Sequence, residues 1–416
     1  MARRLLAGAM LAACLATLAS GSAAKDTPVK DTAVKATSEP SVRYLPLDAP
    51  AGMSQAVVVQ GYPLVHTRQL LPLDRQGKLV GEGSAEKQIE QVLTNLEKVL
   101  GAAGSGLGKL VRVNVYAMSQ QVVGLLREQL SKRLDPAIRP AITAVLTPLA
   151  HRKALVAVDA VAVAAEKGQA VAFQRAEAVA GDKDCADAAV MPRGGVAYLS
   201  GQPEKGQLAQ ATARSLSTLL GIVGQLKLTP AQVVQVKVFV RPATSADVAL
   251  REVKKLFPGQ LTPPVVFVEW IASAPVEIEL IAYLPLTGKP AESVEYYNPP
   301  EVKPSPAFSR VALVRTERQV YVSGLSARAA GNGEAQARDV FAQLKQILSE
   351  TGCDLLHLAK ATYYVSDDEA SDMLNNVRSE FLDLKRPPAA SKVTVHGVGH
   401  AERTLTIDMI AVGSAR

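Results

Sequence analysis

Cysteine and histidine are the residue types best suited to metal binding and covalent chemistry, and both are scarce in this chain of 416 residues. The histidines are scattered singly along it: His66, His151, His357, His396 and His400. No combination of them with the cysteines has the spacing of a metal site, so we expect no metal and no cofactor. Cys185 and Cys353 could form a disulfide in an oxidising compartment, but nothing in the sequence indicates that they approach each other.

Hydroxyl and carboxylate groups recur at matched places and could bind a ligand. Ser200-Gly201 and Ser323-Gly324 each follow an apolar run, where turn formation at a strand end is an equally good explanation. Asp159, Glu279 and Asp408 occupy one alternating position near the end of three apolar segments. We interpret these acids as structural polar residues on one strand face.

The composition indicates a globular protein rather than a disordered one. Apolar residues make up 48% and charged residues 20%, so the chain can bury sizeable cores. The formal charge is +7, but part of this excess lies in an N-terminal stretch outside any expected fold. With one tryptophan, Trp270, and 4% aromatic residues, the stacking platforms of nucleic-acid binders are not evident. We therefore expect no nucleic-acid partner.

The first 24 residues have the order of a secretory signal peptide. Arg3 and Arg4 precede an apolar stretch, and small residues then lead to an expected cleavage after Ala24. Residues 25–40 have no periodicity and are expected to form a disordered tether. No later stretch has 18 consecutive apolar residues, so no transmembrane segment is expected. This pattern predicts a periplasmic or secreted protein.

A second interpretation of the N-terminus is a lipid anchor. Leu11-Ala12-Ala13-Cys14 fits the lipobox of bacterial lipoproteins, in which the cysteine is acylated. However, the apolar run 15–18 follows Cys14 where a polar tether would be expected. We favour a cysteine inside the signal peptide and keep lipid anchoring through Cys14 as the alternative.

The remaining chain repeats one pattern three times. A valine, any residue and an aromatic residue open each copy, and the aromatic residues Tyr44, Phe173 and Tyr296 recur after 129 and 123 residues. A period this regular, supported by the later elements, indicates tandem repeats of one structural unit. The predicted units are 41–165, 170–287 and 293–414.

Each repeat shows the same order of hydrophobic patterns. Two short β-branched runs come first, as at 56–59 and 64–66 in the first repeat, and residues 89–100 then follow a helical period. An alternating strand, a second helix, one or two prolines and two closing strands complete the unit. The second helices are expected over Val122–Leu134, Asp247–Phe257 and Asp368–Phe381. The order ββαβαββ predicts an α/β (α+β) fold with two helices on one face of a mixed sheet.

These motifs, in this order, resemble those of the RidA (YjgF-type) reactive intermediate deaminase family. The fragments that carry the resemblance are Tyr198-Leu199-Ser200-Gly201-Gln202-Pro203, Val320-Tyr321-Val322-Ser323-Gly324, Gln91-Val92-Leu93-Thr94-Asn95-Leu96 and Val276-Glu277-Ile278-Glu279-Leu280-Ile281-Ala282. The resemblance implies chorismate-mutase-like units. Because the family usually forms homotrimers with ligand clefts between subunits, it also implies a monomeric chain that folds as an intramolecular pseudo-trimer.

The resemblance further implies hydrolysis of 2-imino or 2-enamino acids to 2-keto acids and ammonia. In the family, an arginine after a proline-containing motif binds the substrate carboxylate as a bidentate donor. Here that position holds Ile142, Val265 and Ala390. An aliphatic side chain cannot replace a bidentate cation. Lys392 lies on the same strand face as Ala390 and is the one candidate substitute, although it could equally be a solvated strand residue.

The other family positions are partly retained. The catalytic glutamate appears as Glu277 in the second repeat, whereas the first and third repeats hold Ala157 and Thr406. Phe308 stands where the family has a tyrosine, and Asn376 matches an asparagine of the second helix. The ligand-binding pairs correspond to Ser200-Gly201, Ser323-Gly324 and, in the first repeat, Thr67-Arg68.

Two functions remain open on this basis. The first is a non-catalytic scaffold that binds a partner or a small molecule such as a 2-imino or 2-keto acid. The second is a 2-iminobutanoate/2-iminopropanoate deaminase-type hydrolase with a rebuilt site around Ser200, Glu277 and Lys392. We favour the first, with at most one functional cleft, which involves the second repeat. RNA cleavage is disfavoured because the sequence has neither paired histidines nor an aromatic platform.

Overall fold

The computed structural model describes residues 39–288, 290–300 and 304–413. The expected signal peptide, most of the expected tether and Cys14 lie outside this part of the chain. None of the helices in these ranges has the length and apolar character needed to cross a membrane.

The three repeats share the order βββαβαββ, and the third has one further short strand before its last strand. The first has β1 (Ser41–Leu45), β2 (Ala56–Gln60), β3 (Leu64–Thr67), α1 (Ala85–Ala102), β4 (Leu110–Ala117), α2 (Gln120–Arg133), β5 (Ala141–Leu146) and β6 (Val156–Val163). The second has β7 (Ala172–Gln174), β8 (Ala188–Met191), β9 (Gly195–Glu204), α3 (Leu208–Gln225), β10 (Val233–Val240), α4 (Ala246–Lys255), β11 (Val265–Glu269) and β12 (Val276–Leu284). The third has β13 (Val294–Tyr297), β14 (Val311–Val314), β15 (Arg318–Val322), α5 (Gly333–Thr351), β16 (Leu358–Val365), α6 (Asp368–Phe381), β17 (Ala389–Thr394), β18 (Gly397–Val398) and β19 (Leu405–Val412).

The predicted fold class is confirmed, with one more strand at the start of each repeat than the order ββαβαββ contains. The opening valine-x-aromatic segments themselves form the extra strands β1, β7 and β13. Side-chain caps define where helices begin: Ser84 accepts a hydrogen bond from the Lys87 amide at α1, and Asp367 accepts one from the Ala370 amide at α6.

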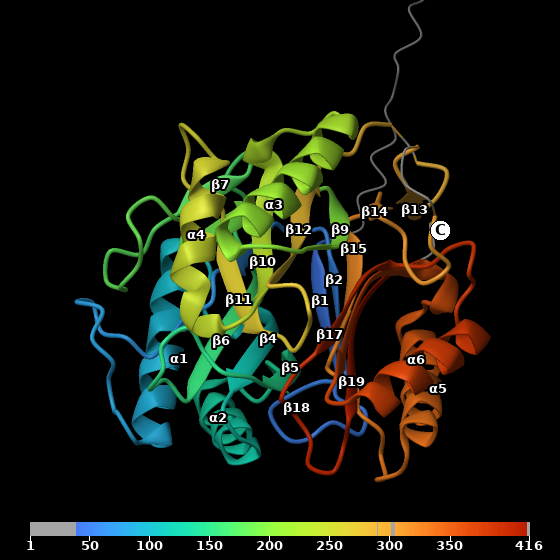
Figure 1. Cartoon of the computed structure of the whole chain (residues 1–416), viewed down its shortest axis with the longest axis horizontal. Helices are drawn as coiled ribbons and strands as arrows, with labels where there is room; N and C mark the ends of the chain where they lie inside the picture. Colours follow the sequence, from blue (N-terminus) through green and yellow to red (C-terminus); the bar gives the residue numbers. More distant parts are fainter. Residues whose placement is uncertain (1–38, 289, 301–303, 414–416) are drawn as a thin grey trace, which may run out of the picture. The chain divides into compact units, whose positions relative to one another are not determined.

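Each of the three sheets combines strands of two or three repeats (Figure 1). The sheet orders are β18-β5-β4-β6-β3-β8-β7, β11-β10-β12-β9-β14-β13 and β1-β2-β15-β19-β16-β17. The first two strands of every repeat therefore join the sheet of another repeat. The hairpin of the second repeat extends the sheet of the first, that of the third extends the second, and β1-β2 extends the third.

Three-residue links make this exchange possible. The chain leaves β2 through residues 61–63 and enters β3 in a different sheet, and residues 192–194 and 315–317 do the same in the other repeats. Gly61 has φ +68°, a left-handed conformation in which a residue without Cβ avoids steric strain. The circular exchange of hairpins is completed where β2 of the first repeat pairs antiparallel with β15 of the third, with Ala56 opposite Val322.

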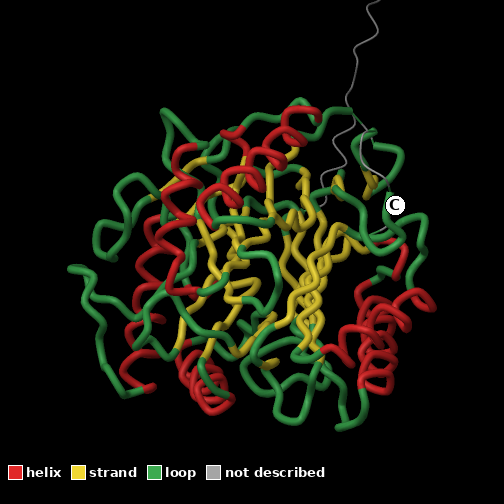
Figure 2. Tube along the Cα trace, in the orientation of Figure 1, coloured by secondary structure: helices red, strands yellow, loops and turns green. Residues whose placement is uncertain are grey.

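Helices cover the outer faces of the sheets, and the inner faces pack against one another (Figure 2). Each helix pair has its own apolar core, formed with the outward face of its sheet. Two further clusters contain residues of all three repeats, as shown by Val111, Val234 and Ala359 at matched positions of β4, β10 and β16. The inner faces therefore form a core that no single repeat possesses.

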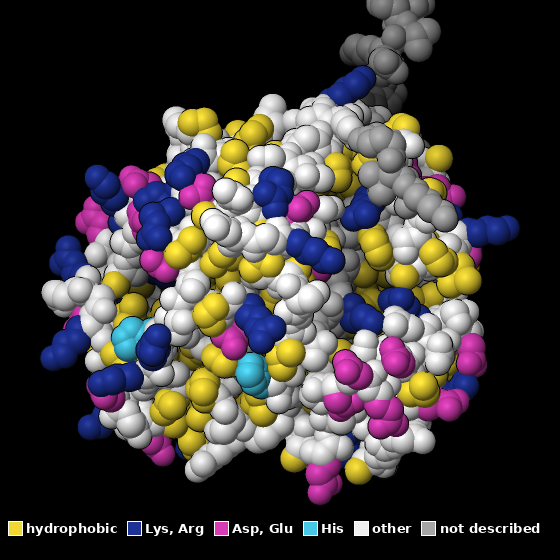
Figure 3. Space-filling model, in the orientation of Figure 1, with side chains coloured by type: hydrophobic (Ala, Val, Ile, Leu, Met, Phe, Trp, Pro, Cys, Tyr) yellow, Lys and Arg dark blue, Asp and Glu magenta, His cyan; other side chains and the backbone are white. Residues whose placement is uncertain are grey.

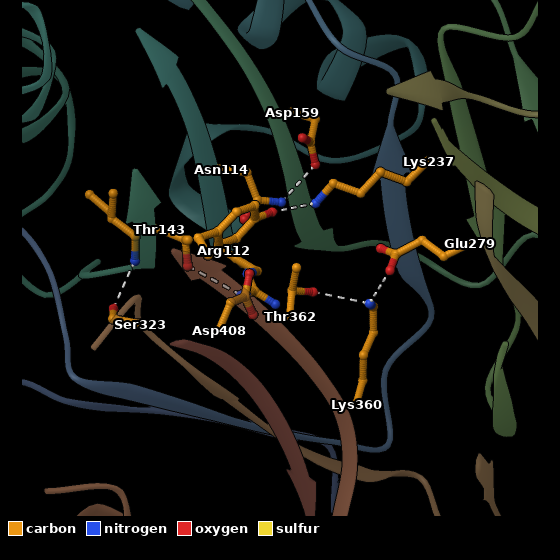
Figure 4. A network of polar contacts seen from close by, with 12 residues as sticks. Arg112, Asn114, Thr143, Asp159, Lys237, Glu279, Ser323, Lys360, Thr362 and Asp408 are labelled. Atoms are coloured by element: carbon orange, nitrogen blue, oxygen red, sulfur yellow. Dashed lines mark hydrogen bonds and ion pairs between the residues drawn. The ribbon is translucent and has the colours of Figure 1, made fainter. Parts of the chain in front are cut away.

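A ring of buried charges lies within this inner region (Figure 4). Arg112 of the first repeat forms an ion pair with Asp408 of the third. Lys360 of the third repeat donates a hydrogen bond to Glu279 of the second, with 2.8 Å between Nζ and Oε2.

The ring is completed by Lys237 of the second repeat. Its ammonium group donates to the Tyr364 hydroxyl at 3.0 Å, and its charge acts on Asp159 of the first repeat. Asp159 also accepts hydrogen bonds from Tyr116 at 2.7 Å and Asn114 at 2.9 Å. Each repeat thus contributes one cation and one carboxylate, and each charge faces another repeat.

Breaking one pair of the ring should be costly. Lys360→Met leaves Glu279 buried without its cation, so we expect the free energy of unfolding to fall by about 3–5 kcal/mol. The double change Lys360→Met with Glu279→Leu should recover most of this loss, because no unpaired charge remains. Guanidinium-induced unfolding followed by circular dichroism measures both.

The control for this experiment is a surface pair. Arg338→Met removes the exposed pairs with Glu334 and Glu380 and should cost far less stability than Lys360→Met. Equal losses for Lys360→Met and Arg338→Met would show that the ring does not hold the repeats together.

Candidate ligand sites at the three junctions

The three repeats meet at equivalent junctions, where the strand that follows the prolines contacts the third strand of another repeat. The Ala390 amide donates to Ser200 Oγ at 2.7 Å, and the Ile142 amide donates to Ser323 Oγ at 2.8 Å. At the remaining junction the Gln69 amide donates to the Val265 carbonyl at 3.0 Å. We name these the second–third, third–first and first–second junctions after the repeats that they join.

The positions that correspond to the family arginine all lie at these junctions. Ile142 is 2% exposed, Val265 is 6% exposed and Ala390 is 9% exposed. Each belongs to the apolar core of its own repeat. The side chains therefore fill space between sheet and helices.

The first repeat aligns one residue later than the sequence analysis expected. Backbone amides of Arg68, Ser200 and Ser323 all donate to the opening hairpin of the next repeat at 2.9 Å. Arg68-Gln69, and not Thr67-Arg68, therefore occupies the serine–glycine position. Thr67 remains in the strand, where its hydroxyl accepts a hydrogen bond from the Ala160 amide at 2.9 Å.

The second–third junction contains the retained glutamate. Glu277 of β12 lies against Gly201 of β9, where an added Cβ would come within 1.9 Å of Glu277 Oε1 and 2.6 Å of Ser391 Oγ. Only glycine fits at position 201 in this arrangement. Glu277 is 7% exposed, and its Oε1 has no hydrogen-bond partner among the described residues.

The environment of Glu277 favours its neutral form. Burial is the main cause that raises the pKa of Glu277 to about 8, and the negative charge of Glu279 adds to it. Hydrogen bonding by Ser391 and the positive charges of Lys360 and Arg310 act in the opposite direction. A carboxyl group with this pKa can donate or accept a proton near neutral pH.

A cation that the sequence analysis did not single out, Arg310, reaches this site from the position immediately before β14. Arg310 lies two residues after Phe308, and its guanidinium stacks 5.1 Å from the Phe308 ring centroid. Its Nη1 donates to Gln202 Oε1 at 3.3 Å, and its charge lowers the pKa of Glu277. The signal in the sequence was an arginine two residues after the tyrosine-equivalent position, but its approach to Glu277 depends on the strand exchange.

Lys392 and Asn376 do not join the Glu277 group. Lys392 Nζ donates to Ser371 Oγ at 2.7 Å and to Asn375 Oδ1 at 3.3 Å, both on α6. The side chain of Asn376 is exposed, and its neighbour Asn375 provides the contact with Lys392.

Ser323 and Gly324 lie at the third–first junction, apart from Glu277. The Ser323 hydroxyl donates to the Ser54 carbonyl at 2.6 Å, and Gly324 lies against Thr143. The structure therefore gathers Ser200, Gly201 and Glu277, with Phe308 held beside them through Arg310.

The first–second junction contains an open pocket of about 510 Å³. Its apolar lining comes from both repeats and includes Leu71, Leu73, Ala150, Leu250, Val265 and Phe267. Asp182 and Asp247 also line it and form ion pairs with Lys254 and Arg251, respectively. Arg68 at its floor is fully engaged, because Nε donates to Asp187 Oδ1 at 2.6 Å and the other nitrogens donate to carbonyls of Gln69 and Ala180. Arg75 at the rim is exposed and has no hydrogen bond or ion pair with the described residues.

Cys185 lines the same pocket. It corresponds to Phe308 of the third repeat, because Cys185 precedes Asp187 by two residues as Phe308 precedes Arg310, and the carbonyls of Asp187 and Arg310 accept hydrogen bonds from the equivalent amides of Arg68 and Ser200. Cys185 and Cys353 are both free thiols. Within the described residues, no cluster of histidine, cysteine and acidic side chains is arranged to hold a metal ion.

Comparison with known proteins identifies the family. The profile described as Endoribonuclease L-PSP matches residues 46–164 and 300–413, which is more than half of the chain. The RutC family protein slr0709 of Synechocystis sp. is 33% identical over 117 residues, which cover 28% of this chain and 88% of that protein. The chain therefore belongs to the Endoribonuclease L-PSP family, which includes the RidA and YjgF proteins, and carries the family unit in tandem, as predicted.

Parts of this chain are also similar to solved structures. YyfB of Yersinia pestis, described as a member of the conserved Rid protein family, is 28% identical and covers 29% of this chain and 98% of its own, with a TM-score of 0.26. RidA of the Antarctic bacterium Psychrobacter sp. is 25% identical and covers 23% of this chain and 80% of its own, with a TM-score of 0.21.

The raised pKa of Glu277 predicts a specific pH dependence of stability. Between about 4.5 and 8, the folded protein keeps a proton on Glu277 that the unfolded chain has lost, so stability should fall as pH rises. Glu277→Gln copies the neutral carboxyl and should remove this loss. We expect the stability of the variant relative to the wild type to increase by about 1–2 kcal/mol between pH 6.5 and pH 8, as measured by urea unfolding.

The choice of pH 6.5 as the lower limit avoids the buried histidines, because His66 and His400 have pKa values lowered to about 4. Parallel stability curves for wild type and Glu277→Gln would show that Glu277 is ionised in the folded protein.

Proposed function

We propose that this protein is a RidA-like ligand-binding scaffold without deaminase activity. The observation that carries the proposal is the aliphatic, buried character of Ile142, Val265 and Ala390 at the arginine-equivalent positions. A substrate carboxylate placed there would lose its water without gaining a bidentate cation, at a cost of several kcal/mol.

The first–second junction is the favoured ligand site, because it is an open pocket with an apolar lining and an unpaired cation at its rim. A molecule with an apolar chain and one carboxylate matches this distribution: the chain would pack against Leu250 and Phe267, and the carboxylate would face Arg75. A 2-oxo acid with a branched side chain has this form. Leu250 and Phe267 belong to the second repeat, which is the repeat expected to contribute to the functional cleft.

The proposed setting is the periplasm or the extracellular space, on the basis of the signal-peptide pattern of the first 24 residues, with a lipid anchor at Cys14 as the alternative. We also propose that one chain acts as an intramolecular pseudo-trimer, which the exchange of hairpins among the three sheets supports. Nucleic acid is not a proposed partner. On the face shown in Figure 3, acidic side chains gather over α6, whose first turn contains Asp368 and Glu369.

The direct test of catalysis uses freshly generated 2-iminopropionate. Because the carboxylate clamp is replaced by aliphatic side chains, we expect the purified chain from Lys25 onward to release ammonia no faster than buffer. A single-unit relative that retains the arginine is the positive control, and circular dichroism checks that the chain is folded.

The same assay distinguishes the second candidate function, which the Glu277 environment favours. In that case Glu277 would exchange protons with the attacking water, and Arg310 would hold the substrate carboxylate in place of the family arginine. Release of ammonia that is lost in Glu277→Gln and in Arg310→Gln would establish a rebuilt deaminase and overturn the scaffold proposal.

Blocking the pocket should abolish ligand binding. Leu250 lies on α4 at the pocket wall, so Leu250→Trp fills part of the 510 Å³ with an indole ring. We expect this variant to weaken binding of 4-methyl-2-oxopentanoate at least about tenfold in isothermal titration calorimetry, equivalent to about 1.4 kcal/mol. Leu356→Trp, at an exposed leucine of the third repeat, is the matched control. Equal affinity in the two variants would exclude this pocket.

A further inference from the structure

Arg127 of α2 is a largely buried cation that the described residues leave without a partner. Its Nε has no solvent access and no hydrogen bond, and the arginine forms no ion pair or hydrogen bond with any described residue. Burial lowers the pKa of Arg127, and no carboxylate offsets that effect. Leaving a guanidinium half desolvated without a counter-charge is unfavourable unless an anion completes the site.

In the third repeat, the position that corresponds to Arg127 belongs to a group of side chains that are hydrogen-bonded to one another. Helices α2 and α6 both have 14 residues and begin after the caps Ser119 and Asp367, so Arg127 corresponds to Asn375. In the third repeat, Asn375 and Ser371 accept hydrogen bonds from Lys392.

In the first repeat, every member of that group has changed. Val123 replaces the serine and Ala144 replaces the lysine, as the matched pairing of β5 and β17 with their neighbours shows. The positive charge has moved from the strand to the helix at Arg127, and the side chains at the equivalent positions can accept no hydrogen bond.

A loop of the third repeat covers this position. Gln120 of α2 donates to the Val398 carbonyl at 2.6 Å, and β18 pairs with the edge of β5. Gly399 lies so close to Ala144 that an added Cβ would come within 2.6 Å of the alanine Cβ and carbonyl oxygen. The walls around Arg127 therefore come from both sides of the third–first junction.

The neighbouring charges are also positive. His400 follows Gly399, and burial together with the fields of Arg127 and Arg403 lowers the pKa of His400 to about 4. Arg403 is engaged with backbone carbonyls, including that of Ala327 at 2.7 Å. The site thus has one free guanidinium, a neutral imidazole and an unbalanced positive potential.

We infer that Arg127, enclosed by α2, Ala144 of β5 and the Gly399-His400 loop, forms a binding site for a small oxyanion. The planar guanidinium fork matches a carboxylate or phosphate group through two parallel hydrogen bonds. This site is separate from the first–second pocket and does not depend on the function proposed for that pocket.

The test is titration of inorganic phosphate, and separately of acetate, into the intact chain at constant ionic strength, followed by calorimetry. We expect saturable binding of at least one of the two anions. Arg127→Gln should weaken it at least about tenfold, and Arg127→Lys should restore part of it because the charge returns without the fork. Arg139→Gln removes a partly exposed arginine of the same repeat, whose Nε donates to the Pro136 carbonyl, and should leave the affinity unchanged.

A second readout reports the anion at its site. A bound anion should raise the pKa of His400 above about 4, and NMR titration of the imidazole signals detects this rise, with His400→Ala assigning the signal. The rise should be absent in Arg127→Gln. Lack of saturable binding by the wild type, or equal binding by folded Arg127→Gln, would overturn the inference.

Discussion

The buried ring of charges is the constraint on which the assembly of the three repeats depends. Arg112, Lys237 and Lys360 are held away from water, and the carboxylates that compensate them belong to other repeats. In an isolated repeat these charges would lie in water or be buried without a partner, and desolvation of an unpaired ion costs several kcal/mol. The ring therefore makes the inner faces of the sheets specific for one another, beyond what the surrounding apolar clusters provide.

Because the three repeats lie in one chain, the three junctions can differ in the residues at their matched positions. In a homotrimer one substitution changes every cleft, whereas here each junction has its own residues at matched positions. The serine–glycine position holds Arg68-Gln69 at the open pocket, Ser200-Gly201 beside the buried Glu277, and Ser323-Gly324 against Thr143. Cations have also moved: Arg310 reaches Glu277 from β14's side of its junction, and Arg127 stands on a helix where the third repeat has Asn375.

Local patterns were sufficient for the elements but not for their partners. The second helix of the third repeat was expected over Asp368–Phe381 and has those bounds, because its cap and apolar period lie in adjacent residues. The proximity of Ser200, Gly201 and Glu277 followed from the family motif. The exchange of hairpins was not predictable, because β2 has the same composition whichever sheet it joins. The approach of Arg310 to Glu277 depends on that exchange and was missed for this reason, whereas the surroundings of Arg127 depend on a loop of the third repeat that covers α2 of the first.

Pairing of β2 with β15, which completes the circular exchange of hairpins, has a kinetic consequence. Ala56 must pair with Val322 across about two thirds of the chain, and such nonlocal pairing slows folding because the entropy of loop closure is lost before the strands form their contacts. The β1-β2 hairpin has no sheet to join until the third repeat has formed, so its edges stay available to other chains. Docking of the β1-β2 hairpin on β15 is therefore the folding step most open to pairing between chains. Folding at low protein concentration should favour chains that close on themselves over dimers that exchange this hairpin.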